Sequence, residues 1–252
     1  MNTVLHVAAL TGRNLIRLRR APGKLVGITL NPLVMLLAFG LLFRDVLAVP
    51  LTVDHVFAGA AVQVGLATLG PTAIAMAEDV RGGLFDRFRT APIARVSVLA
   101  GHTFADLAAV GAGMVVVSGA GLVLGWRPHG GPVAVVAGFA LALGFAYVVL
   151  WLGVLLGLTV RGLPAVDTIA ALVLVTFSFL STAFVPVEGL PAWLRPVVEW
   201  NPISVVVDAC RSLWGNGSAD VLTAVAVLVA GLVVAAGASL FAAARPSAGG
   251  SS

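Results

Sequence analysis

Long apolar runs alternate with short polar segments along the whole chain. Six runs reach the roughly 17–25 residues that a helix needs to cross the hydrocarbon core of a bilayer. None shows the period of two that marks the strands of a β-barrel. The pattern predicts an all-α integral membrane protein, a single transmembrane domain over residues 1–252, with six transmembrane helices at about 25–43, 55–77, 98–124, 133–160, 164–185 and 220–243.

Two segments outside these runs are expected to contact the membrane surface. Arg13, Arg17 and Arg20 share one helical face, so residues 1–24 are predicted to form an amphipathic interfacial helix, with a simple topology anchor as the alternative. Residues 186–218 are too apolar for a solvated loop and too rich in proline to cross the bilayer. We expect short outer-leaflet helices there, before the sixth span, with a covered outer cap as the alternative.

The composition is typical of a chain that is solvated by lipid. Only 10% of the 252 residues are charged and 60% are hydrophobic, whereas a soluble domain has about 25% charged residues. The isoelectric point of about 10.5 is interpreted as a sign of membrane topology, so no nucleic-acid partner is expected. Cys210 is the only cysteine, which excludes an intrachain disulfide and a cysteine-based metal site, and no metal is expected.

The basic residues orient the six spans. Both termini lie on one side, and that side holds all of the 15 Lys and Arg residues except Arg44, Arg127, Arg195 and Arg211. The positive-inside rule therefore predicts that both termini are cytoplasmic. Four tryptophans fall near the opposite face, as in an interfacial aromatic belt: Trp126, Trp193, Trp200 and Trp214.

The sequence lacks the common motifs of ATP hydrolysis and of hydrolytic enzymes. Leu18 occupies the first glycine position of a phosphate loop that would end at Lys24, and neither H-E-x-x-H nor G-x-S-x-G occurs. We therefore expect a chain that is not an enzyme. Two interpretations of the acidic residues in the spans remain open: a proton relay, or pairing near the interface. The residues concerned are Asp106, with His102 one turn before it, and Asp167.

A charged, amphipathic block separates the second and third spans, and residues 78–96 are expected to form a cytoplasmic loop. Val80, Leu84, Phe85 and Phe88 share a helical face, and Thr90-Ala91-Pro92 ends the helix. Spacing alone permits a helix resting on lipid headgroups or a docking element for a soluble partner.

The block "RGGLFDRFRTAPIAR", followed by "VLAG", resembles the signature of ABC exporter permeases of the type-2 class, particularly the daunorubicin-resistance branch. Weaker similarity covers "NPLVMLLAFGLLF", "VDHVFAGAAVQ" and "LPAWLRPVVEWNPISVVVDACRSLWGNG", although His55 and Ala60 depart from the usual choices. The similar segments occur in order along the chain. The strong match runs through Glu78, Arg81, Gly82, Leu84, Asp86, Arg87, Phe88, Arg89, Pro92, Arg95 and Gly101.

The resemblance implies the transmembrane subunit of an ATP-binding cassette exporter in the bacterial plasma membrane. A separate cytosolic ATPase would bind ATP and Mg²⁺, and the permease would pair with itself or with a sibling. The substrate would be a hydrophobic or amphipathic drug or a lipid-like molecule. The block would be the coupling helix that contacts the ATPase, through Glu78, Arg81, Gly82, Leu84, Phe85, Asp86, Arg87, Phe88, Arg89 and Pro92.

The resemblance also implies a substrate pathway at a dimer seam formed by the first and fifth spans. Ser178, Ser181 and Thr182 are expected to share one face of the fifth span, and ordinary helix packing is the alternative. Rival functions are a proton-coupled secondary transporter, a non-transporting membrane scaffold and, third, an intramembrane enzyme. The candidate pathway residues are Asn31, Pro32, Phe177, Ser178, Ser181 and Thr182.

Phe88→Ala and Pro92→Ala test the coupling helix. Each variant is expected to weaken binding or coupling of the ATPase, because Phe88 would fill a groove on that subunit and Pro92 ends the helix. ATPase pull-down and export are the measurements, with membrane insertion as the control. Normal export by both variants would refute the assignment.

Overall fold

The computed structural model describes residues 22–42, 52–82, 95–184, 187, 190–215 and 217–244, and these contain helices and no strands. The all-helical prediction is confirmed for this part of the chain. The elements are α2 (Pro22–Leu37), the π-helical turn η1 (Ala38–Leu42), α3 (Val53–Leu66), α4 (Leu69–Arg81), α6 (Arg95–Leu124), α7 (Pro132–Thr159), α8 (Leu163–Phe179), α9 (Arg195–Glu199), α10 (Pro202–Leu213) and α11 (Val221–Ala244).

Five helical segments are long and apolar enough to cross a membrane: Leu25–Leu42, Val53–Arg81, Thr103–Leu124, Pro132–Thr159 and Val221–Ala243. They correspond to five of the six predicted spans. The remaining predicted span, 164–185, is represented by α8, which is apolar but only 17 residues long.

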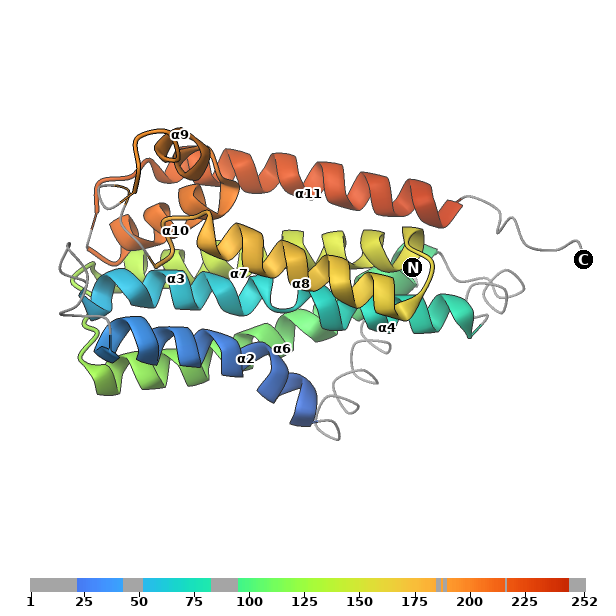
Figure 1. Ribbon diagram of the computed structural model, residues 1–252, viewed down its shortest axis with the longest axis horizontal. Coiled ribbons are helices and arrows are strands. Elements are labelled where there is room, and N and C mark those ends of the chain that lie inside the picture. Colours follow the sequence, from blue (N-terminus) through green and yellow to red (C-terminus); the bar gives the residue numbers. More distant parts are fainter. Residues whose placement is uncertain are drawn as a thin grey trace, which may run out of the picture.

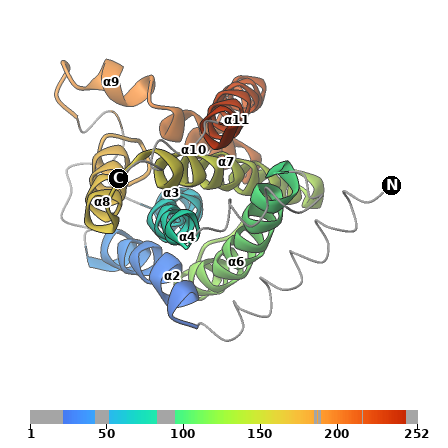
Figure 2. The ribbon, with the colours of Figure 1, turned by 90° about the vertical axis from the view of Figure 1, so that its right-hand side faces the viewer.

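The segment formed by α3 and α4 is the centre of the bundle (Figure 2). Every residue from Val56 to Leu66 is buried, as expected for a helix that is surrounded by others. A turn at Ala67 and Thr68 separates α3 from α4, and the Thr68 hydroxyl donates to the Gly65 carbonyl at 2.6 Å. Helices α2, α6, α7 and α8 pack around this centre, and α11 packs against α7 and α10.

Close packing of the centre against α7 depends on glycine. A Cβ added to Gly65 would lie 2.8 Å from the Ala146 Cβ on α7. A Cβ added to Gly157 would overlap the Ala73 carbonyl oxygen and lie 2.8 Å from the Met76 Cβ on α4. Small residues are the usual means by which membrane helices approach this closely, because lipid offers no hydrophobic force between them.

Helices α9 and α10 lie together at one end of the bundle (Figure 1), which we call the α10 end. Helix α4 ends at the opposite end, which we call the α4 end. The Asn201 side chain caps α10 by accepting a hydrogen bond from the Ile203 N–H at 2.9 Å, and Pro202 takes the first helical position. The sequence thus correctly predicted short helices in this segment.

The aromatic belt predicted from the tryptophans is wrong for two of its four members. Trp126 and Trp214 are 3% and 1% exposed, and their rings pack together with Phe57 in the core. Helix α10 brings Trp214 inward, so this ring fills the bundle instead of lying at its surface. Trp193 and Trp200 are exposed.

Gly157→Ala is expected to destabilise the fold, because the new methyl group meets backbone atoms of α4 that cannot rotate away. Overpacking of this kind costs about 1–3 kcal/mol. Gly111→Ala on α6 is the matched control, since a Cβ there has no neighbour within 4 Å. Thermal unfolding in detergent should show a lower Tm for the first variant only, and equal Tm values would contradict this packing argument.

Candidate functional site

A polar cluster joins three helices inside the apolar bundle. Gln63 of α3 is 5% exposed. Its Nε2 donates to the Asn31 Oδ1 on α2 at 3.3 Å and to the Ser178 Oγ on α8 at 3.4 Å. The structure therefore brings together two residues that the sequence singled out, through a third that it did not. Gln63 is the final letter of "VDHVFAGAAVQ", where a single amide in an apolar run was the available signal.

The other predicted pathway residues do not form one wall with this cluster. The prediction that Ser178, Ser181 and Thr182 share a helical face is wrong, because α8 ends at Phe179. Phe177 and Phe179 are exposed, and Pro32 is buried inside α2.

Where α8 ends, side chains satisfy carbonyl groups that the helix leaves free. The Asn201 Nδ2 donates to the Leu180 carbonyl at 2.6 Å, and the Ser181 hydroxyl donates to the Ser178 carbonyl at 2.8 Å. The Thr182 N–H donates to the Ser204 Oγ at 3.0 Å. Ser181 and Thr182 are thus buried parts of a turn that rests on α10.

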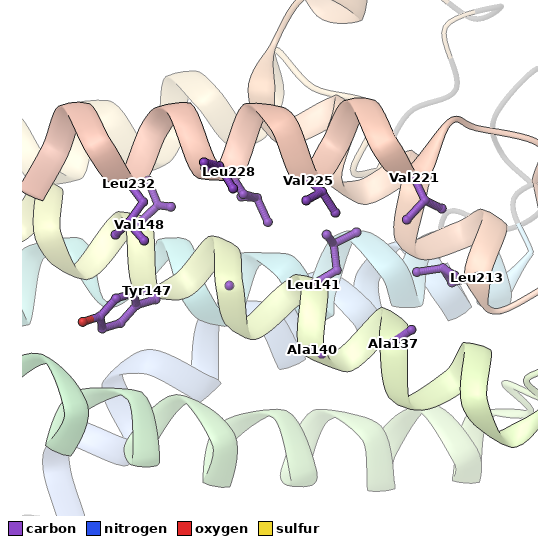
Figure 3. A pocket seen from close by; sticks show the side chains of 12 residues that line it. Ala137, Ala140, Leu141, Tyr147, Val148, Leu213, Val221, Val225, Leu228 and Leu232 are labelled. Carbon is purple, nitrogen blue, oxygen red and sulfur yellow. The ribbon is translucent and has the colours of Figure 1, made fainter.

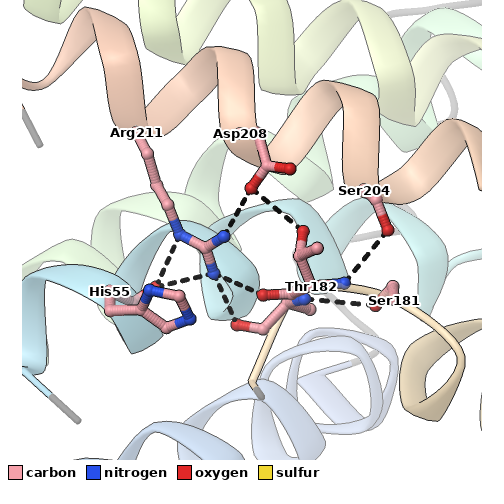
Figure 4. A network of polar contacts seen from close by, with 7 residues as sticks. His55, Ser181, Thr182, Ser204, Asp208 and Arg211 are labelled. Carbon is pink, nitrogen blue, oxygen red and sulfur yellow. Dashed lines mark hydrogen bonds and ion pairs between the residues drawn. The ribbon is translucent and has the colours of Figure 1, made fainter. Parts of the chain in front are cut away.

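Arg211 of α10 ties this turn to the start of α3 (Figure 4). Its guanidinium is buried and donates to the Thr182 carbonyl at 2.5 Å and to the Ala183 carbonyl at 3.1 Å. It also donates twice to the His55 carbonyl on α3, at 3.2 and 3.1 Å. We call this set of contacts the Arg211 clamp. The planar fork of arginine suits it to several acceptors at once.

The charge of Arg211 is balanced within α10. The Asp208 Oδ1 lies 2.6 Å from the Arg211 Nη1 and accepts a further hydrogen bond from the Thr182 hydroxyl at 3.0 Å. An arginine buried in a membrane protein requires such a partner, because an unpaired charge is costly there. Arg211 belongs to the segment "LPAWLRPVVEWNPISVVVDACRSLWGNG", which gave no indication of its partners.

The described part of the predicted coupling block lies at the α4 end of the bundle. Glu78 and Arg81 are exposed on the last turn of α4. Gly82 ends that helix, with its N–H donating to the Glu78 carbonyl at 2.8 Å. Helix α4 thus ends at Arg81, within the first residues of the predicted coupling block, and a glycine pair follows in the sequence. Residues 1–21 of the interfacial helix predicted over 1–24 lie outside the described residues, and residues 22–24 belong to α2. The remaining coupling candidates also lie outside the described residues: Leu84, Phe85, Asp86, Arg87, Phe88, Arg89 and Pro92.

The acidic residues considered for proton transfer lie apart in the structure. Asp106 is buried on α6 and accepts a hydrogen bond from the Thr72 hydroxyl of α4 at 2.7 Å. Asp167 is exposed on α8. His102 falls within α6, where its side chain is outside the described set. Among the side chains that are described, no three His, Cys, Asp or Glu residues gather to hold a metal ion.

An apolar groove of about 440 Å³ lies between α7 and α11 (Figure 3). Its lining side chains are apolar except for Tyr147, and include Leu141, Val148, Leu228 and Leu232. A groove of this kind offers contact area but few groups that orient a polar ligand. The Gln63 cluster is therefore the better candidate for recognition.

Comparison with known proteins identifies the family. The family model of the ABC-2 type transporter matches residues 6–214, which is most of the chain. The protein belongs to the ABC-2 type transporter family. Members of this family are non-catalytic membrane subunits. Together with the five apolar helical spans, family membership makes the chain a multi-pass permease of the bacterial inner membrane.

Individual relatives agree with this assignment and confirm the resemblance to the daunorubicin-resistance branch. The daunorubicin resistance ABC transporter permease protein DrrB1 of Streptomyces coeruleorubidus is 30% identical over 80% of this chain and 72% of its own length. The probable doxorubicin resistance ABC transporter permease protein DrrC of Mycobacterium tuberculosis is 29% identical over 62% of this chain and 57% of its own length. The putative transport permease ycf38 of Pyropia yezoensis is 24% identical over 84% and 75%.

Arg211→Ala is expected to destabilise this permease strongly, because Asp208 and several carbonyl groups would lose their buried partner. Breaking a buried ion pair from one side costs about 3–5 kcal/mol. Arg127→Ala is the matched control, since Arg127 is exposed and bonds to carbonyls of its own segment. Thermal unfolding in detergent is the measurement, and a similar Tm for both variants would show that the Arg211 clamp contributes little.

Proposed function

We propose that this permease is the transmembrane subunit of an ATP-driven exporter for a hydrophobic or amphipathic, drug-like or lipid-like substrate. ATP and Mg²⁺ would be bound by a separate cytosolic ATP-binding cassette subunit. The observation that carries the proposal is the 30% identity to a daunorubicin resistance permease over 80% of the chain. A polar cluster in the centre of an apolar bundle is the accompanying structural support.

The proposal includes six spans with both termini in the cytoplasm, and α8 is the span that needs explanation. At about 1.5 Å per residue, its 17 residues extend less than the ~30 Å hydrocarbon core. The turn that follows is buried and its backbone is bonded by Asn201, Ser204 and Arg211. Irregular backbone is tolerated at membrane depth when protein covers it, so α8 and this turn together complete a crossing.

Coupling would pass from the α4 end to the polar cluster through one central segment. Glu78 and Arg81 are exposed where a partner subunit would dock, and Gln63 lies on the same α3–α4 segment. A buried turn joins the two helices of this segment, and packed elements of this kind move between discrete arrangements. A push at the end of α4 would therefore displace Gln63 relative to Asn31 and Ser178.

The proposed dimer seam uses apolar faces that the single chain leaves exposed. On α2 the exposed residues recur at helical spacing, at Val26, Leu30, Val34 and Leu37, and Leu41 of η1 follows them. On α8 they are Ile169, Leu172, Val175 and Phe179. A second copy or a sibling permease would cover both faces and enclose a pathway between the first and fifth spans.

Co-purification with the ATP-binding cassette ATPase encoded beside this permease tests the proposal. We expect a stable complex whose ATP hydrolysis in liposomes rises with one class of amphipathic compound. Arg81→Ala should weaken the complex because it removes an exposed charge beside the docking block. Arg161→Ala is the control, since Arg161 is exposed and follows the end of α7.

Two outcomes would reject the exporter. One is a folded permease that associates with no ATPase. The other is transport that proceeds without ATP and stops when the proton gradient is collapsed, which would favour the secondary transporter.

A further inference from the structure

One end of the Gln63 carboxamide has no partner among the described residues. Its Nε2 faces Asn31 and Ser178, whereas the buried Oε1 accepts no hydrogen bond. We propose that this oxygen binds a hydrogen-bond donor on the transported compound, such as a hydroxyl, amine or amide N–H group. The inference rests on the proposed export function and assigns Gln63 as the residue that selects for the donor.

The orientation of the carboxamide follows from its neighbours. With Nε2 toward the Asn31 Oδ1, an N–H group meets an oxygen. With Asn31 oriented as in the structure, the reverse orientation of Gln63 would place two amide oxygens against each other, which is unfavourable. The atom without a partner is therefore the acceptor Oε1, which can bind a hydrogen-bond donor.

Packing gives no reason for an amide at this position. The neighbours of Gln63 on α3, Val62 and Val64, are fully buried and apolar, and a Leu or Met would fill the same space without a polar atom. The two bonds that Gln63 does make are long, at 3.3 and 3.4 Å. A half-satisfied polar group in a core is less stable than an apolar one. Such a group is typical of a site that a ligand completes.

The Gln63 amide group contacts α2 and α8, so a ligand would reach it by entering between these two helices. Helix α2 packs on α3 and α6, while α8 packs mainly on α4. At the start of η1, Phe39 stacks on Phe184 with ring centroids 5.2 Å apart, which joins the first span to the turn after α8. Separating α2 from α8 would open Gln63 and leave the contacts of α3 and α4 with α7 in place.

The ligand class follows from these surroundings. A compound entering between α2 and α8 meets apolar side chains over most of its surface and one acceptor at Gln63. It would be an amphipathic molecule with an apolar body and at least one donor group. A fully apolar compound of the same shape would leave Oε1 unpaired and would bind less well.

The test compares the binding of pyrenebutanol and of its methyl ether to purified permease, by pyrene fluorescence. The two probes share their apolar body and differ in the donor. Hydrogen bonds inside membrane proteins correspond to roughly 3- to 20-fold in affinity. We expect wild type to prefer the alcohol by that factor, and Gln63→Met to bind the two compounds with equal affinity.

Ser239→Ala is the matched control. It removes a different buried polar group, the hydroxyl that donates to the Trp151 carbonyl and joins α11 to α7. This variant should keep the preference for the alcohol. If Gln63→Met does not fold, the wild-type comparison still tests the proposal, because equal affinity for the two probes would refute it.

Equal affinity of wild type for both probes, no binding of either, or an unchanged preference in Gln63→Met would overturn the assignment of Gln63. None of these results depends on the ATPase. Conversely, a permease that discriminates between the probes but never associates with an ATPase would refute the exporter and leave the donor site standing.

Discussion

The need to satisfy every backbone polar group within the bilayer determines how the α10 end of this permease is built. Helix α8 stops after 17 residues, and the carbonyls of its last turn and of Thr182 and Ala183 must find donors inside the protein. Asn201 and Arg211 provide them, and both belong to the α10 segment. Helix α10 is thereby held inside the bundle, which in turn places Trp214 against Phe57 and Trp126 in the core.

The central α3–α4 segment connects the polar cluster around Gln63 with the α4 end of the bundle, where part of the predicted coupling block lies. Its middle carries Gln63, between Asn31 and Ser178, and its end carries the exposed Glu78 and Arg81. Glycines allow α7 to lie directly against this segment, so its sideways movement is limited by backbone contact. Helices α2 and α8 have exposed apolar faces and are freer to change neighbours. The proposed alternating pathway is consistent with this division between a tightly packed centre and two outer helices.

Much of the fold could be predicted because span length and hydropathy are properties of single segments. The limits of five spans agree with the predicted ones to within a few residues at most of their ends. The end of α8 could not be predicted, because it depends on Asn201 and Arg211, which are distant in sequence. The same holds for Trp126 and Trp214: their sequence neighbours resemble an interface, and only the direction of α10 makes them core residues. Gln63 was overlooked because its importance comes from two partners on other helices.

The burial of the central segment has a consequence for how the chain is assembled during synthesis. Among the five candidate spans of the described chain, Val53–Arg81 is the least hydrophobic and also the most enclosed by protein. Burial in lipid alone therefore stabilises this span least. The helix that packs against it most extensively is α7, which emerges from the ribosome two spans later. Before α7 is translated, the central segment lacks its main packing partner. Packing of this central segment therefore depends on helices that are translated after it, with α7 as the main one.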